Sequence, residues 1–253
     1  MDFHSKVVLV TGAGAGIGYA TALMFGKLGG QVVLVDANKE KGQKAQEAFI
    51  AAGLESQLII ADIQDGQQIK KCIENVEERW GKLDILINNA GIYIQGSVKE
   101  VSEEQWERIL KINLTGAFLF TKFALPLLIK SKRGVIINVA SEAGLVGIKN
   151  QVAYNVSKAG LIGFTRSCAV DLAPFGIRVN SVCPGTTDTP LVQAAIRNAE
   201  DPVAARYDLE KVRPLNRLGR PEEIASAIIY LSSDEAGYVT GSILSIDGGY
   251  TAQ

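Results

Sequence analysis

The sequence predicts an α/β fold, with a doubly wound parallel sheet contained in a single domain. Seven short runs rich in valine and isoleucine recur along the 253 residues, and longer stretches with helical periodicity separate them. Because these runs are continuously apolar instead of alternating, both faces of each strand are expected to be covered, as in a parallel sheet between two helical layers. No linker, repeat or low-complexity tract divides the chain, so one domain is expected for residues 1–253.

The strands and helices can be placed in order along the chain. Strands are expected at 6–11, 31–36, 57–62, 83–88, 134–140, 177–183 and 242–246. Helices are expected at 17–28, 39–52, 66–80, 103–130, 151–174 and 221–231. Pro126 is expected to kink the helix 103–130, and Pro221 suits the first turn of the last helix.

Residues 188–216 are the exception to this alternation, because they are polar, weakly periodic and follow a Pro-Gly pair. Open α/β sheets bind ligands beside the loops at the carboxyl ends of their strands. We therefore expect residues 188–216 to form a mobile substrate lid.

The composition excludes several classes of protein. Lys and Arg number 26 and Asp and Glu 27, a balance that indicates neither nucleic acid nor an anionic membrane as a partner. No apolar run approaches the roughly 20 residues that span a bilayer, and residues 1–6 do not resemble a signal peptide, so a cytoplasmic protein is expected. The three cysteines are widely spaced and odd in number, which disfavours a disulfide framework. The single histidine, His4, disfavours a Ser-His-Asp hydrolase, and no metal site is expected.

A glycine-rich turn after the first predicted strand indicates a dinucleotide site. Thr11 is followed by glycines at 12, 14, 16 and 18, and a predicted helix begins at once. Such glycines let backbone amides at a helix N-terminus approach a pyrophosphate, although strand-to-helix turns without ligands also contain glycine. Asp36 ends the second strand, where a carboxylate can bind the adenosine ribose or simply cap the next helix.

This carboxylate would repel the additional phosphate of NADP. Neither Arg nor Lys occupies positions 13, 14, 15 or 37, where a cation could compensate. The sequence therefore predicts NAD(H) as the cofactor.

Together these motifs resemble those of the short-chain dehydrogenase/reductase family, and the resemblance covers essentially the whole chain. The matching residues are Thr11, Gly12, Gly16, Gly18, the run Asn88-Asn89-Ala90-Gly91, Asn113, Ser141, Tyr154, Lys158, Pro184, Gly185 and Thr189. The resemblance implies a Rossmann-like fold and hydride transfer between a secondary alcohol and its ketone. It also implies cofactor contacts from Gly12, Gly16, Ile17, Gly18, Asp36, Asp62, Ile63, Asn89, Gly91, Tyr154, Lys158, Pro184, Gly185, Thr187 and Thr189.

The candidate catalytic residues have a chemical reason for their spacing. Removing an alcohol proton with a phenol, whose ordinary pKa is about 10, needs a nearby cation. Tyr154 and Lys158 lie four residues apart, on one face of a predicted helix. Ser141, at a strand end, can donate a hydrogen bond to the substrate oxygen. The resemblance implies that Asn113 holds a water that connects Lys158 to solvent and that Lys158 also binds the nicotinamide ribose.

Each of these residues also has an ordinary structural explanation. A serine at a strand end is often a cap, a helical asparagine often bonds to the backbone, and a Tyr/Lys pair can be a surface contact. Weaker candidates for contact with substrate are Glu142, Gln151 and Tyr93.

Two other functions remain open at this point. A reductase of 3-oxoacyl chains in fatty-acid synthesis would be expected to carry a basic residue near the glycine turn. A non-catalytic dinucleotide sensor would be expected to have lost Ser141, Tyr154 or Lys158. The resemblance and the apolar faces of helices 103–130 and 151–174 predict a homotetramer, with residues 247–253 near a subunit contact.

Overall fold

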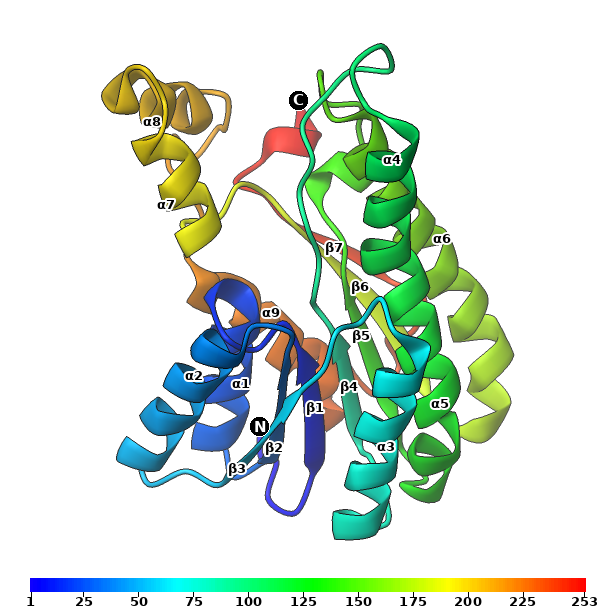
Figure 1. The fold of residues 1–253 in the computed structure, drawn as a ribbon. Coiled ribbons are helices and arrows are strands. Elements are labelled where there is room, and N and C mark those ends of the chain that lie inside the picture. Colours follow the sequence, from blue (N-terminus) through cyan, green and yellow to red (C-terminus); the bar gives the residue numbers. More distant parts are fainter.

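In the computed structural model, which describes residues 1–253, a seven-stranded sheet forms the centre of the molecule (Figure 1). Every neighbouring pair of strands is parallel, and the strand order is β3-β2-β1-β4-β5-β6-β7. The strands are β1 Val7–Thr11, β2 Gln31–Asp36, β3 Ser56–Ile60, β4 Ile85–Asn88, β5 Val135–Val139, β6 Arg178–Pro184 and β7 Ile243–Ile246. The predicted fold class, a doubly wound parallel sheet in an α/β domain, is confirmed.

Helices cover both faces of this sheet (Figure 1). One face carries α1 Gly16–Lys27, α2 Lys39–Ala51 and α9 Pro221–Ser232. The other face carries α3 Gly66–Trp80, α5 Gly116–Lys130 and α6 Val152–Leu172, and α4 Glu103–Leu110 leads into α5. All connections therefore bring the carboxyl ends of the strands to a single edge of the sheet.

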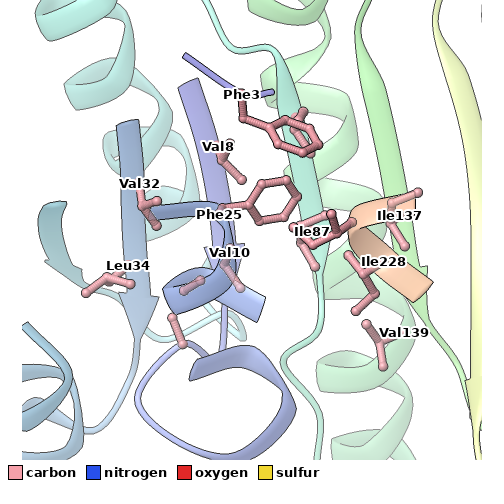
Figure 2. Packing of buried hydrophobic residues seen from close by; sticks show 14 of the residues in the cluster. Phe3, Val8, Val10, Phe25, Val32, Leu34, Ile87, Ile137, Val139 and Ile228 are labelled. Atoms are coloured by element: carbon pink, nitrogen blue, oxygen red, sulfur yellow. The ribbon is translucent and has the colours of Figure 1, made fainter. Parts of the chain in front are cut away.

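Two apolar clusters, one on each face, hold the layers together. Val8 and Val10 belong to the cluster under α1, α2 and α9, whereas Val7 and Leu9 belong to the cluster under α3, α5 and α6. Figure 2 shows the first cluster, in which the rings of Phe3 and Phe25 meet edge to face at 4.9 Å. Fully burying one such side chain contributes about 1.5–3 kcal/mol to folding, so continuous apolar strands stabilise both layers.

The helix predicted for residues 103–130 differs from the expectation. It is divided into α4 and α5 by a π-helical turn at Lys111–Thr115, while Pro126 lies inside α5. Single π turns insert one extra residue into a helix and often occur at functional sites. The combined stretch Glu103–Lys130 is long and apolar enough to cross a membrane, but half of its most apolar window is buried in this fold, so this observation is weak evidence for a membrane span.

The segment 188–216 was expected to be irregular, yet it contains two helices, α7 Pro190–Arg197 and α8 Pro202–Lys211. Neither helix buries a residue, and Figure 1 shows both standing away from the sheet. Each begins with a capping residue followed by proline: Thr189 accepts from the Val192 amide at 3.4 Å, and Asp201 accepts from the Val203 amide at 2.9 Å. A capping residue followed by proline is a sequence signal for the start of a helix, and it is present here although the periodicity of the segment is weak.

Candidate active site

The glycine turn between β1 and α1 has no room for side chains. Gly12 and Gly16 adopt left-handed backbone conformations, with φ of 64° and 57°. A Cβ on Gly18 would lie 2.2 Å from the Gly12 carbonyl oxygen. The turn thus packs tightly against the start of α1, where backbone N–H groups and the helix dipole favour an anion. This cradle fits the pyrophosphate of a dinucleotide, and Ile17 lies at its helical side.

Asn89 and Thr11 hold that turn in place. The Asn89 side chain donates to the carbonyl oxygens of Thr11 at 2.9 Å and Gly12 at 3.3 Å. The Thr11 hydroxyl oxygen accepts from the backbone amides of Asn89 and Ala90, both at 3.0 Å. Asn89 therefore supports the glycine turn through the backbone, a task that its motif position alone did not indicate.

Asp36, predicted to bind the adenosine ribose, lies beside this cradle at the end of β2. Its Oδ2 accepts from the Gly14 amide at 2.8 Å and its Oδ1 from the Asn38 amide at 2.8 Å, so the carboxylate is held beside the turn. Lys41 lies there too, because a Cβ on Gly14 would be 2.8 Å from both the Lys41 Cβ and Asp36 Oδ2. Lys41 lies outside positions 13, 14, 15 and 37, on which the prediction of NAD(H) was based.

The remaining predicted cofactor residues lie along the same edge of the sheet. Asp62 and Ile63 follow β3, and Ile63 packs on Gly116 at the start of α5. Gly185 is pressed against Asp247, since a Cβ there would be 2.7 Å from the Asp247 Cα. Pro184 and Thr187 are buried and Thr189 is half-buried where β6 ends, and Thr189 contacts Gly16. Gly91 is exposed just beyond the end of β4.

The candidate catalytic side chains meet at this edge as well. The Lys158 ammonium lies over the Tyr154 ring, 5.7 Å from its centroid, as their spacing on α6 predicted. Lys158 Nζ donates to the Val139 carbonyl oxygen at 2.8 Å. Ser141 caps a 3-10 turn, because its hydroxyl accepts from the Ala143 amide at 3.2 Å. Ser141 therefore has the structural capping role that was the alternative to a catalytic one. Its buried hydroxyl nevertheless lies next to Tyr154.

Burial dominates the electrostatics of this group. It raises the pKa of Tyr154 to about 12, although the Ser141 hydroxyl partly offsets this. Burial also lowers the pKa of Lys158 to about 8. Burial thus disfavours both the Tyr154 phenolate and the Lys158 ammonium. A phenolate at Tyr154 therefore depends on the positive charge of the neighbouring lysine.

Asn113 lies in the π turn between α4 and α5 and joins two parts of the site. Its Oδ1 accepts from the Ile92 amide at 2.8 Å, and its Nδ2 donates to the Ile92 carbonyl at 3.0 Å and the Ser157 hydroxyl at 3.0 Å. The side-chain amide is therefore occupied by protein partners. A water held by Asn113 would have to bind its backbone instead.

Of the weaker candidates, Tyr93 stands beside the catalytic group, and Gln151 is half-buried just before α6. The rings of Tyr93 and Tyr154 meet edge to face at 5.2 Å, and Tyr93 is 41% exposed. Glu142 instead points into the protein, where its Oε1 lies 2.6 Å from Arg213 Nη2. Sequence reasoning did not single out Arg213. No group of three or more His, Cys, Asp or Glu side chains is placed to hold a metal ion.

Comparison with known proteins places this geometry among oxidoreductases. The family profile described as enoyl-(acyl carrier protein) reductase matches residues 12–251. An uncharacterized oxidoreductase of Thermotoga maritima is 46% identical over all of both chains. The 3-oxoacyl-[acyl-carrier-protein] reductase of the same organism is 39% identical, over 98% of this chain and 99% of that protein. Cyclohexanol dehydrogenase of Acinetobacter sp. (strain SE19) is 38% identical, over 99% and 97%. Among solved structures, levodione reductase superposes with a TM-score of 0.95 at 34% identity, covering 99% of each chain.

Proposed function

This chain belongs to the short-chain dehydrogenase/reductase family, and on that premise we propose that it is an NAD(H)-dependent oxidoreductase that interconverts a secondary alcohol and its ketone. The observation that carries the proposal is the position of Tyr154 and Lys158 relative to the glycine turn. A Cβ on Gly91 would lie 3.5 Å from Lys158 Nζ, and Gly91 follows the residues that brace Gly12. A proton-transfer group and a dinucleotide cradle thus share one edge of the sheet.

The proposed mechanism assigns a task to each side chain. The Tyr154 phenol oxygen takes the hydroxyl proton of the alcohol as the carbinol carbon loses its hydride. Lys158, held by the Val139 carbonyl, stabilises the phenolate, and the Ser141 hydroxyl donates to the substrate oxygen. The glycine turn and Asp36 would hold NAD⁺, which would supply the hydride acceptor when bound. In the reverse direction Tyr154 returns the proton to the ketone oxygen.

NAD(H) is the proposed form of the cofactor because Asp36 is fixed where the adenosine ribose would lie. Two backbone amides orient its carboxylate, which would repel a phosphate at that position. Lys41 moderates this repulsion but is exposed, so solvent weakens its effect. The Asp36 carboxylate is therefore expected to decide the preference for NAD(H) over NADP(H).

A reductase of 3-oxoacyl chains is the second candidate, favoured by the similarity to the Thermotoga maritima enzyme of that name. It predicts faster turnover of a 3-oxoacyl thioester with NADPH than of any secondary alcohol with NAD⁺. Asp36 argues against it. A non-catalytic sensor ranks below both, since Ser141, Tyr154 and Lys158 are all present. We further propose a cytoplasmic homotetramer that acts on small alcohols or ketones.

The test of the proposed function is the pair Tyr154→Phe and wild type, assayed with a panel of secondary alcohols that begins with cyclohexanol. Removal of the phenol oxygen should lower kcat by at least about 100-fold, the lower end of general acid-base contributions. NADH affinity, followed by fluorescence titration, should stay within a few-fold because the glycine turn and Asp36 are intact. Normal NADH binding with near wild-type turnover would show that another group moves the proton.

A further inference from the structure

Arg213 forms a buried junction between four segments that are distant in sequence. Its side chain is 3% exposed and its guanidinium donates to Glu142, the Leu209 carbonyl and the Thr186 hydroxyl. It also lies 5.3 Å from the centre of the Tyr250 ring. The segments joined are the turn after Ser141, the end of α8, the loop after β6 and the C-terminal turn.

The Glu142 carboxylate is the only charged partner in this junction. It is 6% exposed, and its Oε1 lies 2.6 Å from Arg213 Nη2. A hydrogen bond between two charged groups is stronger than one between neutral groups, and burial limits screening by salt. The nearby Asp247 does not compete for Arg213, because its oxygens accept from the Gly249 amide and from Thr251.

The segment 188–216 is hydrogen-bonded to the rest of the protein near its two ends. Neither α7 nor α8 buries a residue. At its first end the Asp188 amide donates to the Gly219 carbonyl at 2.8 Å, and the Gly219 amide donates to the Thr186 carbonyl at 3.1 Å. At its second end the Leu215 amide donates to the Gly248 carbonyl at 3.1 Å, and the Gln253 side chain donates to the Val212 carbonyl at 3.0 Å. The contact of Arg213 with Glu142 is the one ion pair between this segment and the rest of the protein. Loss of that ion pair therefore weakens the second of the two ends that hold α7 and α8.

We propose that Glu142 and Arg213 are positioning residues whose ion pair anchors the segment 188–216 over the turn that carries Ser141, and so sets the affinity for substrate. The inference rests on the proposed function, in which this segment is the substrate lid. It does not extend to Ser141 itself, because the backbone bonds of that turn, Gly144 to Ser141 and Leu145 to Glu142, do not involve the Glu142 carboxylate.

The experiment compares Glu142→Gln, Arg213→Met and the double variant with wild type. Glutamine keeps the size of the side chain and an acceptor oxygen but removes the charge, so all variants are compared at pH 8, above the raised pKa of Glu142. The matched control is Glu210→Gln, which breaks an ion pair with Arg206 inside α8 and no contact with the rest of the protein. Thermal unfolding and NADH titration verify that each variant is folded.

Two readouts separate positioning from a general structural role. Amide hydrogen exchange in α7 and α8 should accelerate about tenfold in both single variants, the scale expected when a charge-assisted hydrogen bond is lost. The KM for cyclohexanol at saturating NAD⁺ should rise about tenfold, by a larger factor than any change in kcat, which can shift because the Glu142 charge also raises the pKa of Tyr154. The double variant should be no worse than either single one, because both remove the same contact. The control should match wild type in both readouts.

Unchanged exchange in α7 and α8 would overturn the proposal whatever the activity. Faster exchange with an unchanged KM, or a fall in kcat alone, would equally overturn the positioning role. If no secondary alcohol is a substrate for the wild type, the proposed function fails, and the exchange measurement still decides whether this pair anchors the segment.

Discussion

Glu142 is expected to make the protein less stable as the pH rises from about 5 to 8. Burial raises its pKa to about 7 from an ordinary value of 4.5; the Arg213 charge opposes that rise and the Asp247 charge adds to it. Between these two values the folded state holds a proton that the unfolded chain has released. The stability contributed by Glu142 is therefore complete below about pH 4.5 and lost as the pH rises through about 7.

The size of this loss follows from the gap between the two pKa values. At about 1.4 kcal/mol per unit, the change from 4.5 to about 7 corresponds to about 3 kcal/mol. Glu142→Gln removes the ionisation, so its free energy of unfolding relative to wild type should improve by about 2 kcal/mol between pH 5 and pH 8.

Urea unfolding at one protein concentration, followed by the fluorescence of Trp80 and Trp106, measures the difference at both pH values. Glu223→Gln is the control, because hydrogen bonding to Arg217 lowers the pKa of Glu223 to about 2 and the group is ionised in both states across this range. The difference in free energy of unfolding between Glu223→Gln and wild type should not depend on pH. A Glu142→Gln variant that is destabilised equally at pH 5 and pH 8 would refute the reasoning.

The remaining predictions concern the cofactor and assembly. The kcat/KM of wild type with NAD(H) should exceed that with NADP(H) by at least about tenfold. Asp36→Ala should reduce this ratio of kcat/KM values and Lys41→Ala should increase it. Equal kcat/KM for both cofactors in wild type would contradict the assignment of NAD(H). Gly18→Ala should weaken NADH binding by at least about tenfold in a fluorescence titration, since its methyl group would displace the Gly12 carbonyl 2.2 Å away; unchanged affinity would show that the turn yields freely. Light scattering should find a homotetramer at micromolar concentration, and a stable monomer would be contrary evidence.

Much of this fold could be predicted because its signals are local. Continuous apolar runs predict doubly covered strands, and the observed strands overlap all seven predictions. Tyr154 and Lys158 share a helix, so their spacing alone places them together. The helices α7 and α8 also had a local signal, the pairs Thr189-Pro190 and Asp201-Pro202. They were not predicted because the periodicity of this segment is weak.

Contacts between distant segments could not be predicted in this way. Arg213 and Glu142 are 71 residues apart, and no pattern in either neighbourhood indicates that they meet. Lys41 reaches the glycine turn only because α2 folds back beside β2. Asn113, in the π turn, likewise bonds to Ile92 and Ser157, which lie in other parts of the chain.

The outlying position of α7 and α8 has a consequence for how such an enzyme can diversify. Because neither helix contributes to the two apolar clusters, residues 190–211 can be exchanged for another sequence without disturbing the layers that hold the sheet. Under the proposed role of this segment as a substrate lid, substitutions there would change which substrate binds, whereas substitutions in the strands would change whether the protein folds. Substrate preference could then change while Ser141, Tyr154 and Lys158 stay the same.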